Sequence, residues 1–533
     1  MEQVVGRAPA ARLRWWCRCL AVALVVSLCP ASLEAPPSAQ ATSVTFAFAL
    51  ASPGVDSANA VVVDSAGNIY VGGAYDGTLD FDPGPGTTSR TSTNGGTDYF
   101  VAKYSPAGAL LWVKTSLGPA FESVDALAID ASGLYVTGTF SGTVDFGLGN
   151  LTSFDDDTFV LKLSLADAST LWQRQFTSND LDRGAAIAVS GTGVYVTGRF
   201  QGTINAGGSD LVSAGGDDIY VARLNASSGA HVWSARFGGA GTTPGEDLGL
   251  GIATDGTGVY VTGHVVGSVN LGGGPLPPFG ENDLFFLRLA ASNGSHVWSR
   301  IVGGVADDEG RGVVVDASGV YFTGAFRRTA DFGGGALSAG GADDNDDDVF
   351  VVKYALADGD HLWSKRFGST APDAGHGIAV SGSRVYVTGK FQGSVSFGPT
   401  LVSTTFNGSP TPDIFVAALA SATGNSLTAY RMGGVSTADT GAAIAVNGTT
   451  VVTAGHFNQT GDFGAGVTTL DLVTDNTFNS FVSSVSLANV APTLSAPASA
   501  QAAQNGTLRF GTLTGNAIAV ADPDVGTGEI QLL

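Results

Sequence analysis

Seven acidic residues occupy the same place in a segment that repeats along this 533-residue chain. Each lies eight residues before the end of a short apolar run, so the seven would share one level near a central channel if the repeats closed into a ring. Carboxylates grouped in this way raise one another's pKa or attract a cation. We favour the alternative, a structural role in which each accepts hydrogen bonds from the backbone amides of its own turn. The seven are Asp56, Glu122, Asp182, Asp247, Asp308, Asp373 and Asp439.

A second acidic group occurs only once. Asp343, Asp344, Asn345, Asp346 and Asp348 belong to a run of hard oxygen ligands in a loop. Such ligands suit calcium, which takes six to eight of them. The run has neither the glycine nor the final Glu of an EF-hand loop, and many acidic loops are only solvated. Calcium at this loop is the one metal or cofactor that the sequence suggests.

Motifs that would indicate catalysis are absent from the sequence. It contains no HExxH zinc site, no glycine-rich phosphate loop and no GxSxG elbow. Most of the histidines recur with the repeat, and His376, near Asp373, has no positioned nucleophile beside it. We therefore predict no catalytic residues. The alternative is a hydrolase or lyase that uses the channel carboxylates, which would need a pair with separated pKa values.

The elements that position these residues are read from the repeat itself. One copy contains a small apolar run such as AVVVD at Ala60, a YVTG-type run, a DxFV-type run such as DYFVAKY at Asp98, and a run around a Trp such as Trp112. Four short antiparallel strands of this kind make one blade of a β-propeller. The seven copies share a glycine in the second run: Gly73, Gly138, Gly198, Gly263, Gly324, Gly389 and Gly455.

The seventh copy has no fourth run, and the missing strand is found at the other end of the repeats. Phe46 precedes Asp64 by 18 residues, as Trp112 precedes Asp130. We therefore predict an all-β fold, a seven-bladed β-propeller over residues 42–488 closed by an N-terminal strand. Closure of this kind removes the open sheet edge that an array would present.

The two ends of the chain differ from the repeats. Residues 1–41 combine four arginines with a short apolar run and a small-x-small end, the pattern of a secretory signal peptide, and they hold all three cysteines of the chain. Residues 489–533 begin with APTLSAP and predict a partial β-sandwich-like module. After signal cleavage we expect no membrane insertion, and a net charge of −22 argues against nucleic acid as a partner.

With its YVTG, DxFV and Trp runs and its GG-to-acid turn, the repeat resembles the bacterial secreted β-propeller repeat family called SBBP, over roughly residues 44–488. The fourth copy departs from the pattern at Val265 and the sixth lacks the Trp. The last residues resemble the start of a cadherin-like or immunoglobulin-like module, in which Asp522 and Asp524 are the acidic pair. The resemblance implies an extracellular, non-enzymatic repeat protein with no shared catalytic residues.

These observations predict a secreted or cell-surface propeller, monomeric, that acts as a non-catalytic binding or display scaffold. Its partner would be an extracellular glycan, a peptide or a surface polymer, with calcium ordering the acidic loops. One alternative is the channel hydrolase or lyase above, and another is a structural spacer in a larger adhesin-like protein. Non-repeated charged or aromatic residues gathered on one face would favour binding over spacing.

Overall fold

The computed structural model of the chain is built from β-strands. It describes residues 43–93, 96–116, 118, 121–178, 180–239, 247–341, 346–398, 400–403, 405–406, 409–434, 439–464, 471–473, 478–487, 493–495 and 519–521. Within these residues there is no helix, and so none that could cross a membrane. The signal peptide predicted over residues 1–41 lies outside the described part of the chain.

Among the described residues, six four-stranded antiparallel sheets and one six-stranded sheet follow one another along the chain. The first strands of the sheets are β2 (Ser57–Val63), β8 (Glu122–Asp130), β13 (Asp182–Ser190), β19 (Leu248–Thr254), β25 (Asp308–Asp316), β31 (Ala374–Ser381) and β39 (Thr440–Asn447). The second strands are β3 (Ile69–Tyr75), β9 (Gly133–Asp145), β14 (Gly193–Phe200), β20 (Gly258–Val266), β26 (Gly319–Arg327), β32 (Arg384–Phe391) and β40 (Thr450–Phe457).

The third strands are β6 (Asp98–Tyr104), β10 (Asn150–Leu163), β17 (Asp218–Asn225), β23 (Asn282–Ala290), β29 (Asp347–Tyr354), β37 (Asp413–Ala420) and β43 (Asn479–Ser486). The fourth strands are β7 (Leu110–Thr115), β11 (Thr170–Gln175), β18 (His231–Phe237), β24 (His296–Val302), β30 (His361–Phe367), β38 (Ser426–Gly434) and, from the N-terminus, β1 (Ser43–Leu50).

Further short strands lie in the loops between these strands. Two of them, β41 (Thr460–Asp462) and β42 (Asp471–Val473), extend the sheet that contains β38. The others are β4 (Thr78–Asp80), β5 (Ser89–Thr91), β12 (Thr177–Ser178), β15 (Thr203–Asn205), β16 (Leu211–Val212), β21 (Val269–Asn270), β22 (Pro275–Leu276), β27 (Thr329–Asp331), β28 (Ala336–Ser338), β33 (Ser394–Phe397), β34 (Thr400–Ser403), β35 (Thr405–Phe406) and β36 (Ser409–Pro410). In the predicted C-terminal module the structure describes only β44 (Thr493–Ser495) paired with β45 (Ala519–Ala521).

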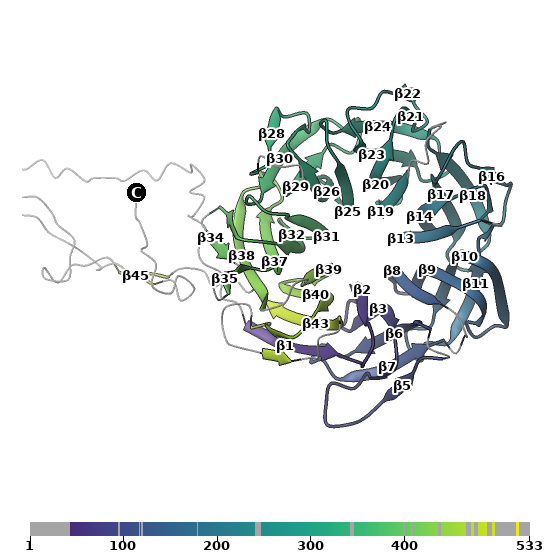
Figure 1. Cartoon of the computed structure of the whole chain (residues 1–533), viewed down its shortest axis with the longest axis horizontal. Coiled ribbons are helices and arrows are strands. Elements are labelled where there is room, and N and C mark those ends of the chain that lie inside the picture. Colours follow the sequence, from purple (N-terminus) through teal and green to yellow (C-terminus); the bar gives the residue numbers. More distant parts are fainter. Residues whose placement is uncertain are drawn as a thin grey trace, which may run out of the picture. The chain divides into compact units, whose positions relative to one another are not determined.

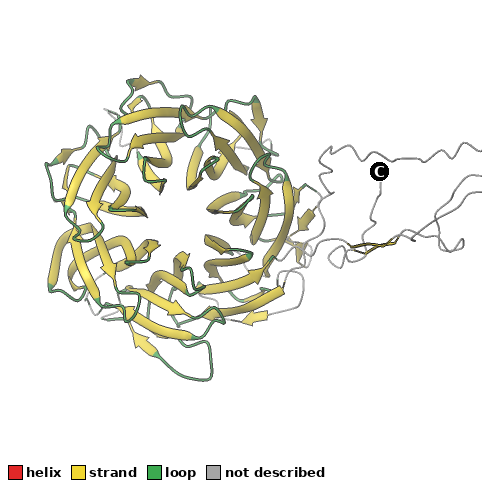
Figure 2. Ribbon diagram, turned by 180° about the vertical axis from the view of Figure 1, so that it is seen from behind, coloured by secondary structure: helices red, strands yellow, loops and turns green. Residues whose placement is uncertain are grey.

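The first strand of each sheet contacts the first strands of the two neighbouring sheets, and β2 contacts β39 as well as β8. Figure 1 shows the sheets following one another around a ring, with these first strands nearest its centre. The same arrangement is seen from behind in Figure 2. The predicted all-β propeller is therefore confirmed.

The second strands lie at the middle of the core. All seven residues of β3 are buried, because apolar side chains on both of its faces pack against other sheets. The core is correspondingly divided into clusters that each join neighbouring sheets. One of them combines Ile219 and Trp233 of one sheet with Val261 and Leu287 of the next.

The strand β1 pairs with β43 in antiparallel register, from Ser43 opposite Ser486 to Leu50 opposite Ser480. The aromatic ring of Phe46 covers Gly108 in the neighbouring sheet, where an added β-carbon would lie 2.9 Å from the ring. Gly108 has a φ of 83°, which glycine adopts without strain. The N-terminal strand thus occupies the fourth place in the sheet of β39, β40 and β43.

Tryptophans fill the equivalent place in other sheets and fasten each sheet to the next. Trp363 of β30 is 7% exposed, and its Nε1 donates a hydrogen bond to the carbonyl of Ser421 at 3.1 Å. Its ring lies over Gly424 in the turn that follows β37. Trp172 and Trp233 donate in the same way to Ala226 and Ala291.

Candidate functional site

The seven repeated carboxylates are buried. Asp373 and Asp308 show most clearly how one carboxylate is hydrogen bonded to two loops. Asp373 accepts hydrogen bonds from the backbone amides of Ser369 (2.6 Å) and Gln392 (2.8 Å). Asp308 accepts them from Gly304 (2.7 Å) and Arg327 (3.0 Å). All seven are 4% exposed or less. In this geometry a carboxylate ties the loop before a first strand to the turn after the second strand.

In six of the seven cases a second acidic residue, in the third strand of the preceding sheet, lies near the carboxylate; for Asp56 the equivalent residue is Asn479 at the start of β43. Asp283 and Asp308 both approach Gly303 so closely that a β-carbon there would collide with their oxygens. Burial above all raises the pKa of Asp308 to about 7, and the negative charges of Asp283 and Asp307 add to the effect. Burial, with a contribution from Asp348, likewise raises the pKa of Asp373 to about 7. The sequence showed both acids, but the repeat alone could not show that they meet between sheets.

The repeated carboxylates do not line the central cavity. A cavity of about 200 Å³ is bounded by residues of all seven first strands, and none of the seven carboxylates is among them. The seven carboxylates, which we expected near the channel, lie instead at the start of each first strand, between sheets. One of the seven, Asp308, lines a separate, smaller cavity around Arg311.

Each first strand carries a β-bulge three residues after its carboxylate, and the seven bulged residues are of six different types. In β25, for example, the register with β26 shifts between Gly310 and Gly312, which leaves Arg311 unpaired with the neighbouring strand. A bulge adds one residue to a strand and re-aims its side chain. The seven bulged residues are Asn59, Asp125, Ala185, Leu250, Arg311, His376 and Ala442. We refer to them as the bulge ring.

The bulge ring provides the non-repeated side chains of the channel. Every member except His376 lines the central cavity. Sequence reasoning missed it because the repeat was read for what the copies share. The signal was present as one position, three residues after each acid, at which the copies disagree in charge and size.

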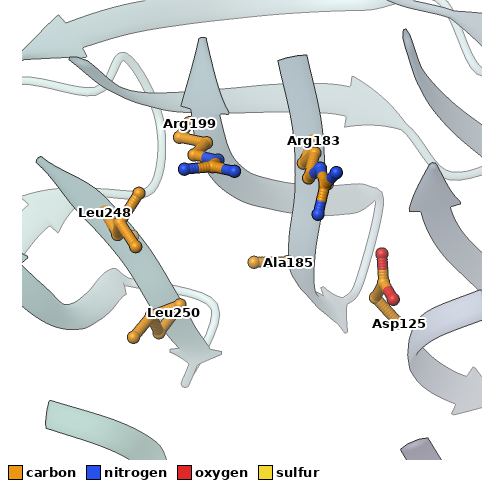
Figure 3. Close-up of a pocket in the computed structure, with 8 residues that line it drawn as sticks. Asp125, Arg183, Ala185, Arg199, Leu248 and Leu250 are labelled. Carbon is orange, nitrogen blue, oxygen red and sulfur yellow. The ribbon is translucent and has the colours of Figure 1, made fainter. Parts of the chain in front are cut away.

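A larger cavity of about 450 Å³ opens between β8, β13, β14 and β19, and we call it the arginine pocket. Its lining residues are Asp125, Arg183, Gly184, Ala185, Arg199, Leu248, Gly249 and Leu250. Figure 3 shows Arg183 and Arg199 on neighbouring strands, with Leu248 and Leu250 on one side of the space and Asp125 on the other. Three members of the bulge ring, Asp125, Ala185 and Leu250, thus belong to it.

Acidic residues outside the pocket hold its two guanidinium groups. Arg183 forms an ion pair with Asp156 at 2.8 Å, and Arg199 forms one with Asp217 at 2.9 Å. The carboxylate of Asp125 accepts hydrogen bonds from the hydroxyls of Ser123 (3.1 Å) and Thr139 (3.2 Å). Burial raises the pKa of Asp125 to about 7, against the lowering effects of these hydroxyls and of Arg183.

A smaller cavity of about 170 Å³ lies around Arg311, between the sheet of β20 and the next sheet along the chain, that of β26. Glu309 contacts Arg311 at 2.6 Å and His264 at 3.7 Å. Although burial opposes it, these two partners lower the pKa of Glu309 to about 2. His376 is hydrogen bonded to the carbonyl of Gly441 at 3.2 Å, and burial with nearby Arg311 lowers its pKa to about 3, so this imidazole is neutral.

The predicted calcium loop falls largely outside the described residues, which exclude Asp343, Asp344 and Asn345. Asp346 lies just before β29, and Asp348, near the start of that strand, is fully buried. Asp348 accepts hydrogen bonds from the guanidinium of Arg366 and the amide of Gly340. In the described part of the chain no three acidic, His or Cys side chains gather closely enough to hold a metal ion.

No model of a known protein family and no curated protein matches the chain. Solved propeller structures resemble it at low identity. The quinohemoprotein alcohol dehydrogenase of Comamonas testosteroni has a TM-score of 0.39 and 11% identity, over 88% of this chain and 79% of its own. BamB of Moraxella catarrhalis has a TM-score of 0.37 and 11% identity, over 84% and 100%. The Dos1 propeller has a TM-score of 0.40 and 10% identity, over 84% and 95%.

Proposed function

We propose that this chain is a secreted or cell-surface, seven-bladed propeller, closed by its own N-terminal strand, that binds an extracellular ligand without catalysis. The ligand is a glycan, a peptide or a surface polymer held at the end of the channel where the bulge ring lies. The arginine-rich, apolar N-terminal segment and the resemblance of the repeat to the SBBP family support export. The pairing of β1 with β43 supports closure.

The observation that carries the binding proposal is the bulge ring. Seven identical backbone distortions present seven side chains that range from Ala to Arg and from Asp to His. A spacer would need only the repeated features, because packing between blades does not depend on which side chain lies in the channel. Unlike residues held on a rigid frame are typical of a recognition surface.

A hydrolase or lyase that uses the repeated carboxylates is the less supported function. These groups are 4% exposed or less, and backbone amides take up their oxygens in the sheets of Asp247, Asp308 and Asp373. A general acid or base must come within hydrogen-bond reach of the substrate. Of the seven, Asp308 lines the cavity around Arg311, and both of its carboxylate oxygens already accept backbone amides.

Alanine substitution in the bulge ring tests the binding proposal. Ala185 and Ala442 show that the bulge accepts alanine, so Asp125, Leu250, Arg311 and His376 can all be changed to Ala in one variant. The purified protein and this variant are screened on glycan and peptide arrays. We expect at least one ligand of the unchanged protein to be lost while the melting temperature stays similar. Identical array profiles would contradict the proposal.

A further inference from the structure

The arginine pocket combines three kinds of chemistry in one space. Arg183 and Arg199 supply cations, Leu248 and Leu250 supply an apolar surface, and Asp125 supplies a hydrogen-bond acceptor. The volume of about 450 Å³ is within the range of small-ligand sites, which is about 300 to 1,000 Å³. A ligand that uses the whole pocket must carry an anion, an apolar group and an N–H or O–H donor within a few ångströms of one another.

Two guanidinium groups in one pocket are notable in a chain with 47 acidic and only 25 basic residues. The ion pairs to Asp156 and Asp217 fix each guanidinium before a ligand arrives, which lowers the entropy lost on binding. A guanidinium has five N–H donors and binds carboxylates through two of them. Arg183 is half-exposed, so a ligand can reach it while Asp156 holds one of its nitrogens.

We propose that the arginine pocket binds the C-terminal residue of a peptide whose last side chain is apolar. The terminal carboxylate pairs with Arg183 and Arg199, the side chain lies on Leu248 and Leu250, and the last backbone N–H donates to Asp125. This inference rests on the binding function proposed above and names the ligand class at one part of the bulge ring.

Other anions satisfy the pocket less completely. An acidic sugar carries a carboxylate and hydroxyl donors, but it has no aliphatic side chain for the two leucines, and none of the described residues that line the pocket is an aromatic that could stack on a sugar ring. Inorganic phosphate would leave the leucines and Asp125 unused. A nucleic acid would be repelled by the net charge of −22.

Binding of short peptides to the purified full chain tests the inference by fluorescence anisotropy. The panel consists of labelled, N-terminally blocked tetrapeptides that end in Ala, Leu, Phe, Asp or Lys, each as the free acid and as the C-terminal amide. We expect the free acids ending in Leu or Phe to bind at least about ten-fold more tightly than their amides, because only the acid forms charge-assisted hydrogen bonds. Equal binding of acid and amide would overturn the inference, as would no binding of any free acid at about 1 mM, the weak limit for specific sites.

Single substitutions locate the binding. Arg183→Gln and Arg199→Gln should each weaken the best free acid by about ten-fold, since each removes a charged partner. Lys365→Gln on β30, outside the pocket, removes the same charge and should leave the affinity unchanged. Near-ultraviolet circular dichroism and the melting temperature show that each variant is folded. Equal losses in all three variants would mean a general charge effect and would overturn the assignment.

The outcomes separate this inference from the broader proposal. If glucuronic acid oligomers bind through Arg183 and no peptide does, the pocket recognises an acidic sugar and the peptide assignment is wrong, but the binding scaffold stands. If the ligands found on the arrays depend on Arg311 or His376 and not on Arg183, the peptide assignment is again wrong, and the binding scaffold again stands. If the bulge-ring variant changes no ligand and the peptides do not bind, both are wrong.

Discussion

Two positions only three residues apart, at the start of each first strand, differ in how far the residue type varies between sheets and in burial. The first is an Asp in six sheets and Glu122 in the other, and it is buried in all seven, whereas the bulged residue at the second is polar, charged or apolar depending on the sheet. The comparison separates two demands on a repeat protein. Positions that hold neighbouring blades together are fixed by packing and hydrogen bonding, whereas positions that face the channel are free to differ and can be used for recognition.

The largest effect should come from a repeated residue that fastens two sheets. Trp363→Ala removes a buried ring and its hydrogen bond to Ser421, and we expect a loss of about 4 kcal/mol in the free energy of unfolding, as for other buried aromatics. Urea denaturation followed by fluorescence of the remaining tryptophans measures it. The neighbouring Leu362, which is 49% exposed, provides the control, and Leu362→Ala should change stability little. Similar losses in both variants would show that the tryptophans do not fasten the sheets.

The carboxylate and the bulged residue of one strand can be compared directly in β31 and its preceding loop. Asp373→Ala leaves the amides of Ser369 and Gln392 without an acceptor inside the protein, at a cost of about 2 kcal/mol. His376→Ala, three residues later, removes a hydrogen bond to Gly441 and should cost less than about 1 kcal/mol. The two variants are measured by the same denaturation. A larger loss for His376 would break the distinction between the two positions.

The carboxylates should also give stability a dependence on pH. Burial raises the pKa of Asp308 and Asp373 to about 7 and that of Asp182 to about 8, from an ordinary value of 3.8. The folded protein therefore holds protons that the unfolded chain has lost, so the stability that these groups add at low pH falls as the pH rises from about 4 to about 8.

Melting temperatures between pH 5 and pH 8 test this dependence. We expect a decline toward pH 8, and a shallower decline in Asp308→Asn, which cannot ionise at that position. The low pKa of Glu309 acts in the opposite direction below about pH 4.5, and the low pKa of His376 does so below about pH 6.5, so the decline should be clearest between pH 6.5 and pH 8. A melting temperature that rises from pH 5 to pH 8 would contradict the raised pKa values.

The smallest effect is expected for a change within the bulge ring. Ala442→Asn introduces the side chain that Asn59 already places at the same position of another sheet. Because the bulge faces the cavity and not the core, the free energy of unfolding should change by no more than about 0.5 kcal/mol, which the melting temperature measures. A strongly destabilised variant would show that the identity of the bulged residue matters for folding, which would contradict a role in recognition alone.

The sequence was informative wherever the fold repeats. The spacing of Phe46 matched that of Trp112, and in the structure β1 takes the fourth place beside β43, with Phe46 over Gly108. The period and the apolar pattern are enough to predict such a feature, because the same pattern recurs in every copy. The positions of the seven carboxylates along the chain could be read in the same way.

The candidate site was not predicted because it depends on departures from the repeat, which appear only when the copies are compared position by position and not in the pattern of one copy. A bulge shifts the register by one residue without changing the apolar pattern around it, so nothing in the run from Ser57 to Val63 indicates that Asn59 turns into the channel. The arginine pocket combines Arg183, Arg199 and Leu248 from three strands, two of which belong to one sheet and the third to the next. Such a combination depends on the packing of neighbouring sheets, which no single copy of the repeat contains.

The pairing of β1 with β43 also sets an order in time. Leu50 and its partner Ser480 are 430 residues apart, so β1, which is synthesised first, cannot pair until β43 has been synthesised near the end of the chain. At roughly 5 to 20 residues per second, synthesis of the intervening chain takes roughly 20 to 90 s. Phe48 and Leu50 can pack on the first sheet during this interval, but Ala47 and Ala49 on the other face of β1, and its backbone groups that pair with β43, have no partner yet. The strand that gives the finished ring its closure is therefore the segment most exposed to misassembly until the chain is complete.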